Sequence, residues 1–259
     1  MRADRHDGTR LTRQTLVMAL GLIACLFAAE LSAFSAIAQA VRATQPIYET
    51  RTDHDPNGTG KFYMGREIAQ VMGAGGITWL NRPQREDEEK PALVIAALNL
   101  KGGETVADIG AGSGFYTFKI APKVGPSGKV LAVDIQDEMV AALRRGAADR
   151  NAMNVEVTKG SERDPHLPAN SVDLVLMVDV YHELSFPYEM MTAIRNALKP
   201  GGRMVFVEYR KEDPAVAIKE VHKMAVDQLK KEMGAVRLTY IRTVETLPLQ
   251  HIVIFEKRD

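Results

Sequence analysis

The fold of this chain is decided by one stretch, Val106-Ala107-Asp108-Ile109-Gly110-Ala111-Gly112-Ser113-Gly114-Phe115. An apolar strand runs into a glycine-rich loop, and a helical pattern follows. Glycines at such a turn let the backbone bend sharply and approach a ligand closely. The N-terminus of the following helix favours a negative group. The stretch therefore predicts a ligand site at the first strand-to-helix turn of the domain.

Asp134 narrows the class of ligand. It ends the second predicted strand, where an acidic residue can accept hydrogen bonds from ribose hydroxyls. The dinucleotide fingerprint is G-x-G-x-x-G, whereas the spacing here is G-x-G-x-G and Phe115 stands at the third glycine position. Asp108, just before the loop, suits an ammonium group better than a pyrophosphate. The loop favours an amino-acid nucleoside and disfavours an NAD(P)-dependent oxidoreductase.

Outward from this turn, short apolar runs alternate with helical patterns. The predicted strands are Thr105–Ile109, Val130–Val133, Val155–Val157, Val172–Val178 and Met204–Val207, and the predicted helices include Phe115–Ala121, Asp137–Ala148, Tyr188–Leu198 and Ala215–Met233. This alternation predicts an α/β fold with a doubly wound, mostly parallel sheet. The last two apolar runs, Val236–Thr243 and Ile252–Glu256, have only a loop between them. They predict an antiparallel pair at the edge of the sheet.

The sequence resembles the class I S-adenosylmethionine-dependent methyltransferases over residues 91–259. The resemblance is carried by four stretches in order: Asp108–Gly114, Asp134, Asp173-Leu174-Val175-Leu176 and Leu198-Lys199-Pro200-Gly201-Gly202. It implies a Rossmann-like, seven-stranded sheet with an antiparallel last strand. It also implies S-adenosylmethionine as the cofactor and methyl transfer as the activity.

The resemblance assigns roles to individual positions. Cofactor-binding roles fall on Asp108, Gly110, Gly112 and Gly114 for the methionine part, Asp134 for the ribose, Ile135 for the adenine face, Glu162 for the adenine amine, and Asp179. Glu162 is named because Ser161 stands at the usual acidic position. Asp179 begins the stretch Asp179-Val180-Tyr181-His182-Glu183, which would line the methyl-transfer pocket.

His182 and Tyr181 are the predicted catalytic residues. A methyl group on positive sulfur is already activated, so placing the nucleophile in line supplies much of the acceleration. His182 is the best candidate for a general base, should the acceptor need to lose a proton; the alternative is a structural histidine. Tyr181 could pack on cofactor or substrate. No residues show metal-ligand spacing, and His222 is expected to be an ordinary surface or core histidine.

Residues 41–90 form a segment of their own before the α/β domain. A short helical pattern runs from Phe62 to Met72 and ends at a glycine cluster, and a charged stretch covers Arg82–Lys90. Trp79 lies between them. The segment is expected to be a small helical lid that covers the cofactor and selects the acceptor, with plain packing as the alternative.

Residues 1–40 have the pattern of a secretory signal peptide. Four arginines precede an apolar run from Leu16 to Ala29, and Ala38-Gln39-Ala40 is a cleavage site of the A-x-A type. An uncleaved anchor helix and lipoprotein processing at Cys25 are the alternatives. All three predict an exported domain, periplasmic if the source is Gram-negative, and cleavage predicts no stable membrane insertion.

The charge balance and the motif after the fourth strand limit the kinds of molecule that could accept the methyl group. The 259 residues contain 33 Lys+Arg and 33 Asp+Glu, so no basic field argues for nucleic acid. Amino-methylating members of the resembled family carry a characteristic motif after the fourth strand, whereas this sequence has Asp179-Val180-Tyr181-His182 at that place. These features favour carbon or oxygen methylation of a small, partly apolar molecule. Because export separates the domain from cytosolic cofactor, a non-catalytic exported nucleoside-binding protein is the alternative. The sequence makes no prediction of oligomeric state.

Overall fold

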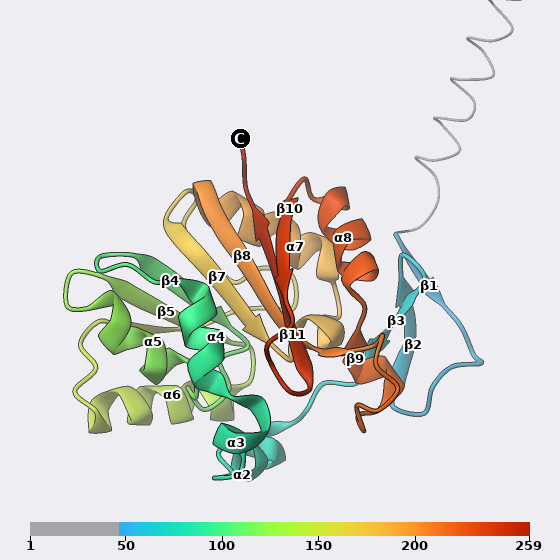
Figure 1. Ribbon diagram of the computed structural model, residues 1–259, viewed down its shortest axis with the longest axis horizontal. Helices are drawn as coiled ribbons and strands as arrows, with labels where there is room; N and C mark the ends of the chain where they lie inside the picture. Colours follow the sequence, from blue (N-terminus) through green and yellow to red (C-terminus); the bar gives the residue numbers. More distant parts are fainter. Residues whose placement is uncertain (1–46) are drawn as a thin grey trace, which may run out of the picture. The chain divides into compact units, whose positions relative to one another are not determined.

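The computed structural model describes residues 47–259, and the predicted signal peptide lies outside this range. The main sheet has the strand order β10-β11-β8-β7-β4-β5-β6, with the short strand β9 beside β8 (Figure 1). These strands are β4 (Thr105–Ile109), β5 (Lys129–Asp134), β6 (Val155–Lys159), β7 (Val172–Val178), β8 (Leu198–Arg210), β9 (Lys223–Met224), β10 (Thr239–Val244) and β11 (Gln250–Glu256). Their arrangement confirms the predicted fold class.

The sheet pairing places the glycine loop in the centre of one edge. Strand β4 pairs in parallel with β5 on one side and β7 on the other. Strand β11 runs antiparallel to both β8 and β10, as expected for the end of the chain. The carboxyl ends of β4, β5 and β7 therefore lie together at one edge, which is where ligands bind in open α/β sheets.

Alternate side chains of the strands build two separate cores, one on each face. Met177 and Phe206 pack with helices α7 (Pro187–Ala197) and α8 (Val226–Ala235). Leu176 and Val205 pack on the opposite face with α4 (Pro91–Leu98) and α5 (Thr117–Val124). Helix α6 (Asp137–Asp149) contributes Leu143 on the α4–α5 face. Both faces of the sheet are thus covered, as in a doubly wound fold.

The first part of the segment before the sheet is β-structure, so the helix predicted from Phe62 to Met72 is wrong. A small antiparallel sheet contains β1 (Tyr48–Thr50), β2 (Gly58–Tyr63) and β3 (Arg66–Ala69). Met64 and Gly65 make the turn between β2 and β3, and both have positive φ. Two positive φ values in a two-residue connection are typical of a tight hairpin. Short helices α2 (Ile77–Leu80) and α3 (Arg85–Glu89) follow.

The segment after β8 also differs from prediction. The helix expected over Ala215–Met233 is confirmed only from Val226, where α8 begins. Before it lie a loop, a single 3₁₀ turn at Glu220–His222 and the short strand β9. Strand β9 pairs with the end of β8, which extends the sheet at that point. The loop and the 3₁₀ turn before β9 bring His222 to the carboxyl end of the sheet.

The N-terminal hairpin is joined to the main body by a buried ion pair. Arg66 on β3 donates to both carboxylate oxygens of Glu232 on α8, at 2.9 and 3.0 Å. Its remaining nitrogen donates to the carbonyl oxygen of His182 at 3.2 Å. Residues 48–259 accordingly form one compact unit. Within residues 47–259, no helix combines the length and the apolar character needed to cross a membrane.

Candidate active site

The glycine loop is held in a conformation that only glycine adopts easily. Gly110 and Gly112 have φ values of 68° and 57°. The N–H groups of Gly110 and Ala111 donate to the carbonyl oxygen of Val133, at 2.9 and 3.0 Å. A Cβ atom on Gly110 would lie 2.5 Å from Cγ2 of Val180. The loop is therefore closely packed between β5 and the segment that follows β7.

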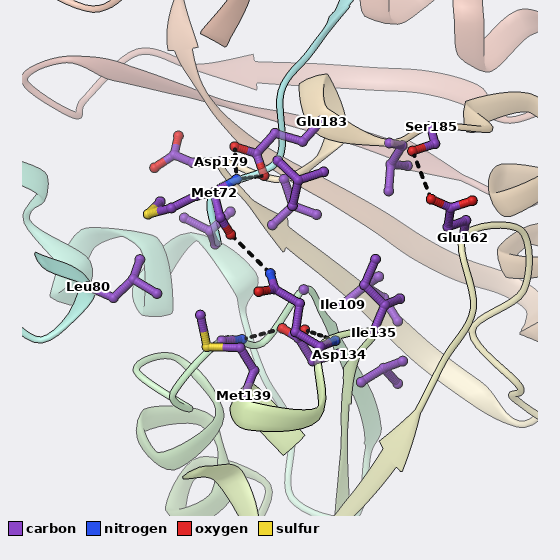
Figure 2. Close-up of a pocket in the computed structure, with 18 of the residues that line it drawn as sticks. Met72, Leu80, Ile109, Asp134, Ile135, Met139, Glu162, Asp179, Glu183 and Ser185 are labelled. Atoms are coloured by element: carbon purple, nitrogen blue, oxygen red, sulfur yellow. Dashed lines mark hydrogen bonds between the residues drawn. The ribbon is translucent and has the colours of Figure 1, made fainter. Parts of the chain in front are cut away.

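Asp134, at the end of β5, lies beside this loop and is bonded to it. One carboxylate oxygen accepts from the N–H of Gly112 at 2.9 Å, and the other accepts from the N–H of Gln136 at 3.0 Å. Figure 2 shows these bonds beside Ile135 and Ile109. The neighbouring Ile135 side chain is 38% exposed, although it is apolar. Two backbone bonds thus fix the carboxylate, while an apolar surface lies next to it.

These residues line a cavity that we call the glycine-loop pocket. Its wall includes Ile109, Gly110, Gly112, Asp134, Ile135, Met139, Glu162, Asp179 and Glu183, together with Val71, Met72, Trp79 and Leu80 from the N-terminal segment. Gln136 donates from its side chain to the carbonyl oxygen of Met72 at 3.0 Å. The segment before the sheet therefore supplies one side of the pocket.

Asp179 fits a ligand site because one of its oxygens is left without a partner. The residue has a φ of 53°, and its Oδ2 accepts from the Gln250 side chain at 2.7 Å. Among the residues that the structure describes, its buried Oδ1 has no hydrogen-bond partner. Burial, with the negative charges of Glu208 and Glu89, raises the pKa of Asp179 well above its usual range. A buried polar atom of this kind is costly unless a ligand satisfies it.

Other predicted cofactor residues are placed differently. Glu162 lines the pocket and accepts from the Ser185 hydroxyl at 3.3 Å. Asp108 lies behind the glycine loop, 3% exposed, and accepts from the Thr117 hydroxyl at 2.6 Å. Burial raises the pKa of Asp108 to about 6. Gly114 contacts α5, where its Cβ would meet Phe118. Asp108 and Gly114 therefore support the loop and do not line the pocket.

A second cavity, the histidine pocket, adjoins the first. Its wall is formed by Asn57, Gln70, Val71, Met72, Trp79, Asp179, His182, Glu183, Tyr209, Ala217, Ile218, Lys219 and His222. Five of these residues, Val71, Met72, Trp79, Asp179 and Glu183, also line the glycine-loop pocket. The two cavities thus share a wall.

His182 is buried and firmly oriented in the histidine pocket. Its Nδ1 lies 2.6 Å from Oε2 of Glu208, and the other oxygen of Glu208 accepts from the N–H of Tyr181 at 2.9 Å. Burial alone lowers the pKa of His182, but the charge and hydrogen bond of Glu208 outweigh it, so the net shift is upward. The carboxylate fixes Nδ1 as the donor, which leaves Nε2 to face the pocket.

Tyr181 is placed elsewhere. Its side chain is fully buried, and its hydroxyl donates to Glu232 at 2.6 Å, within the ion pair formed by Arg66. It lies outside both pockets. The sequence placed Tyr181 against cofactor or substrate, whereas the structure places it outside both pockets, where its hydroxyl joins the turn after β7 to α8.

His222 is a site residue that sequence reasoning missed. Its Nδ1 lies 3.2 Å from Nε2 of His182, 40 positions away in the chain. Burial, followed by the charge of His182, lowers the pKa of His222 to about 4. The segment was expected to be helical, and nothing in its local pattern relates it to His182. Only the loop before β9 brings the two imidazoles together.

Comparison with known proteins agrees with this geometry. Residues 100–250 match the family described as "Methyltransferase domain". An arsenite methyltransferase from Halobacterium salinarum is 38% identical over 104 residues, 39% of this chain and 26% of that protein. The ubiquinone/menaquinone biosynthesis C-methyltransferase UbiE of Ectopseudomonas mendocina is 31% identical over 120 residues, 46% of this chain and 47% of that protein. The chain thus spans less than half the length of these relatives.

A solved structure gives a longer match. The crystal structure of a SAM-dependent methyltransferase from Aquifex aeolicus superimposes with a TM-score of 0.68 and 28% sequence identity. The match covers 72% of this chain and 100% of that chain.

Proposed function

Because the chain belongs to the family of class I S-adenosylmethionine-dependent methyltransferases, we propose that it methylates a carbon or oxygen atom of a small, partly apolar molecule bound in the histidine pocket. One observation carries the proposal. The glycine-loop pocket and the histidine pocket share the wall formed by Val71, Met72, Trp79, Asp179 and Glu183. Two ligands held in these pockets would meet at that wall, as a group transfer requires.

The cofactor is S-adenosylmethionine, and the glycine-loop pocket has the groups to hold it. The glycine loop lines the pocket with residues that carry no side chain, Asp134 offers carboxylate oxygens for the ribose, and Ile135 offers an apolar face for the adenine. The Oδ1 atom of Asp179 needs a partner that a ligand can supply. When bound, S-adenosylmethionine supplies a methyl group activated by positively charged sulfur.

The histidine pocket supports an acceptor that is partly apolar. Met72, Trp79 and Ile218 give it apolar walls, whereas Asn57, Tyr209 and the histidines give it polar groups. Glu208 orients His182, whose Nε2 is placed to accept a hydrogen bond from an acceptor hydroxyl. This orientation would hold the reacting atom in one position, and such positioning supplies much of the rate enhancement in a transfer that needs little other chemistry.

The first test is calorimetric titration of the full-length protein with S-adenosylmethionine and S-adenosylhomocysteine. We expect binding in the micromolar range, about −8 kcal/mol. Asp134→Ala should weaken binding about 100-fold, because it removes the carboxylate that faces the pocket. Asp137→Ala is the matched control, since Asp137 is exposed and pairs with Lys159. A folded wild-type protein that binds neither compound at millimolar concentration would overturn the proposal.

The acceptor side is tested by filling the histidine pocket. Ile218 lines this pocket and does not line the glycine-loop pocket. Ile218→Trp should abolish the S-adenosylhomocysteine formed with a panel of small phenols and quinols, while the affinity for S-adenosylhomocysteine stays unchanged. Equal turnover by the wild type and this variant would place the acceptor elsewhere.

We also propose that the domain acts after export, on the strength of the charged and apolar pattern in residues 1–40. Cell fractionation with N-terminal sequencing tests this directly. Recovery of the protein in the periplasm, beginning at Val41, is the expected result. Recovery of the uncleaved chain in the cytosol would contradict it.

A further inference from the structure

Three ligand-type atoms, from His182, His222 and Glu183, converge in the histidine pocket. Nε2 of His182 and Nδ1 of His222 are 3.2 Å apart. Oε1 of Glu183 lies 3.8 Å from the first and 3.6 Å from the second. The atoms come from the 3₁₀ turns at Tyr181–Glu183 and Glu220–His222. They form a nearly equilateral triangle.

This triangle has the dimensions of one face of a tetrahedral metal site. Zinc binds imidazole nitrogen and carboxylate oxygen at about 2.0–2.2 Å, which places neighbouring ligand atoms of a tetrahedron about 3.3–3.6 Å apart. The observed separations lie within a few tenths of an ångström of that range. Two histidines and one glutamate, with the fourth position open, is a known ligand set of catalytic zinc.

The surroundings of His182 have the features of a metal ligand's supporting groups. A metal-binding histidine usually donates its other ring N–H to a carboxylate, which fixes the tautomer and the ring orientation. Here Glu208 accepts from Nδ1 at 2.6 Å and is itself held by the N–H of Tyr181. Nε2 is therefore the atom with a lone pair, and it faces His222 and Glu183. This support is independent of the triangle's dimensions.

Glu183 is also held in place for this role. The N–H of Met72 lies 3.3 Å from both of its carboxylate oxygens, and Figure 2 shows the side chain directed toward Met72 and Asp179. Its side chain is 12% exposed, whereas His182 is 3% exposed. Because Glu183 lines both pockets, an ion bound to it would lie at the wall that the pockets share.

We propose that His182, His222 and Glu183 bind one divalent transition-metal ion of the zinc class. The open fourth position faces the histidine pocket and takes an oxygen or sulfur donor of the acceptor. Binding of the ion rests on the geometry of the three side chains, whereas its use in methyl transfer rests on the proposed function. With the ion bound, Nε2 of His182 is a ligand, and the metal replaces it as the group that contacts the acceptor.

The test is metal titration of the untagged full-length protein after chelator treatment, without cofactor. We expect one Zn²⁺ per chain by calorimetry, with a dissociation constant of micromolar or below. Co²⁺ should give visible absorption bands of tetrahedral intensity. His222→Asn and Glu183→Gln should each weaken Zn²⁺ binding at least 100-fold and remove these bands. Glu208→Gln should weaken binding about 10- to 100-fold, because it acts through His182.

The matched control is His166→Asn. His166 is an exposed histidine whose Nδ1 lies 3.0 Å from the carbonyl oxygen of Lys159, and asparagine tolerates its positive φ. This variant should bind Zn²⁺ like the wild type. Circular dichroism of every variant would identify a loss of folding. A wild type that binds no more Zn²⁺ than His222→Asn would overturn the proposal and leave a plain hydrogen bond between the histidines.

Failure of the metal site and failure of the proposed function are distinguishable in the same samples. S-adenosylhomocysteine affinity is measured beside the metal titration. Cofactor binding without metal binding would remove the metal site and leave the methyltransferase proposal intact. Metal binding without cofactor binding would leave the metal site intact and remove the methyltransferase proposal.

Discussion

The two pockets are adjacent in space but are assembled over very different distances along the chain. In the glycine-loop pocket, the bond that fixes Asp134 spans 22 positions, to Gly112. In the histidine pocket, His182 meets His222 across 40 positions, and the ion pair behind them joins Arg66 to Glu232 across 166. The part of the glycine-loop pocket around Asp134 is thus one local strand–turn–helix unit with its neighbouring strand. The histidine pocket depends on the segment before the sheet, the turn after β7 and the loop before α8.

The strongest test of this difference is Arg66→Met. The substitution leaves the Glu232 carboxylate buried without its cation, and breaking a buried pair in this way costs about 3–5 kcal/mol. We expect a free energy of unfolding lower by about this amount, measured by urea denaturation. The affinity for S-adenosylhomocysteine at 15 °C should change less than threefold, because Arg66 bonds to Glu232 and to the carbonyl oxygen of His182 and lines neither pocket.

The double variant Arg66→Met with Glu232→Met is the control. It removes the charge that the single variant leaves buried, so it should recover at least half of the lost stability. If Arg66→Met lowers cofactor affinity as strongly as it lowers stability, the two pockets are not separable in the way described above.

Gly110→Ala makes the opposite change, on the cofactor side. The new Cβ would lie 2.5 Å from Val180 and would stand at a φ of 68°. We expect about a 100-fold loss of S-adenosylhomocysteine affinity by calorimetry, equivalent to about 3 kcal/mol. Gly201→Ala is matched in φ, at 77°, but its Cβ would meet open space. It should cost about 1–2 kcal/mol of stability and leave the affinity unchanged. An equal loss of S-adenosylhomocysteine affinity in both variants would mean that backbone strain, and not close packing of the loop, causes the loss.

The contrast between the pockets also explains what could be predicted from the sequence. Gly110, Gly112, Asp134 and Ile135 could be placed because periodicity and the glycine spacing describe local structure and parallel strands bring their ends together. The pairing of His182 with His222 could not be predicted, since it depends on a loop path that no local pattern encodes. The contact of Tyr181 with Glu232 could not be predicted for the same reason, because Glu232 lies on α8, 51 positions away.

The hairpin at Phe62–Ala69 shows a second way in which local patterns fail. Buried Phe62 and Ala69 are seven positions apart, which is one of the spacings found on a single face of a helix. The deciding feature is the turn at Met64 and Gly65, where both residues have positive φ. Met-Gly is not among the residue pairs that usually identify such turns. The apolar pattern alone therefore favoured the wrong element.

Of the three test substitutions, Asp108→Asn is expected to have the smallest effect. It should raise the stability of the protein, whereas the others lower stability or affinity. The pKa of Asp108 is raised by burial from 3.8 to about 6, so the folded state disfavours the charged form. This penalty is fully present above pH 6 and disappears as the pH falls toward 4. Asparagine keeps an oxygen that can accept from Thr117, so the variant should be about 1–3 kcal/mol more stable than the wild type at pH 8.

Thermal unfolding from pH 4 to pH 8 measures this difference, which should shrink toward zero at the acidic end. Cofactor binding gives the second readout. If the charge of Asp108 acts through the glycine loop on the amino group of the cofactor, the stabilised variant should bind S-adenosylhomocysteine about tenfold more weakly at pH 8. Wild-type affinity should then fall as the pH drops below 6, while the affinity of the variant stays level. Identical affinities at every pH would make Asp108 a purely structural support of the loop and confine cofactor recognition to the residues that line the pocket.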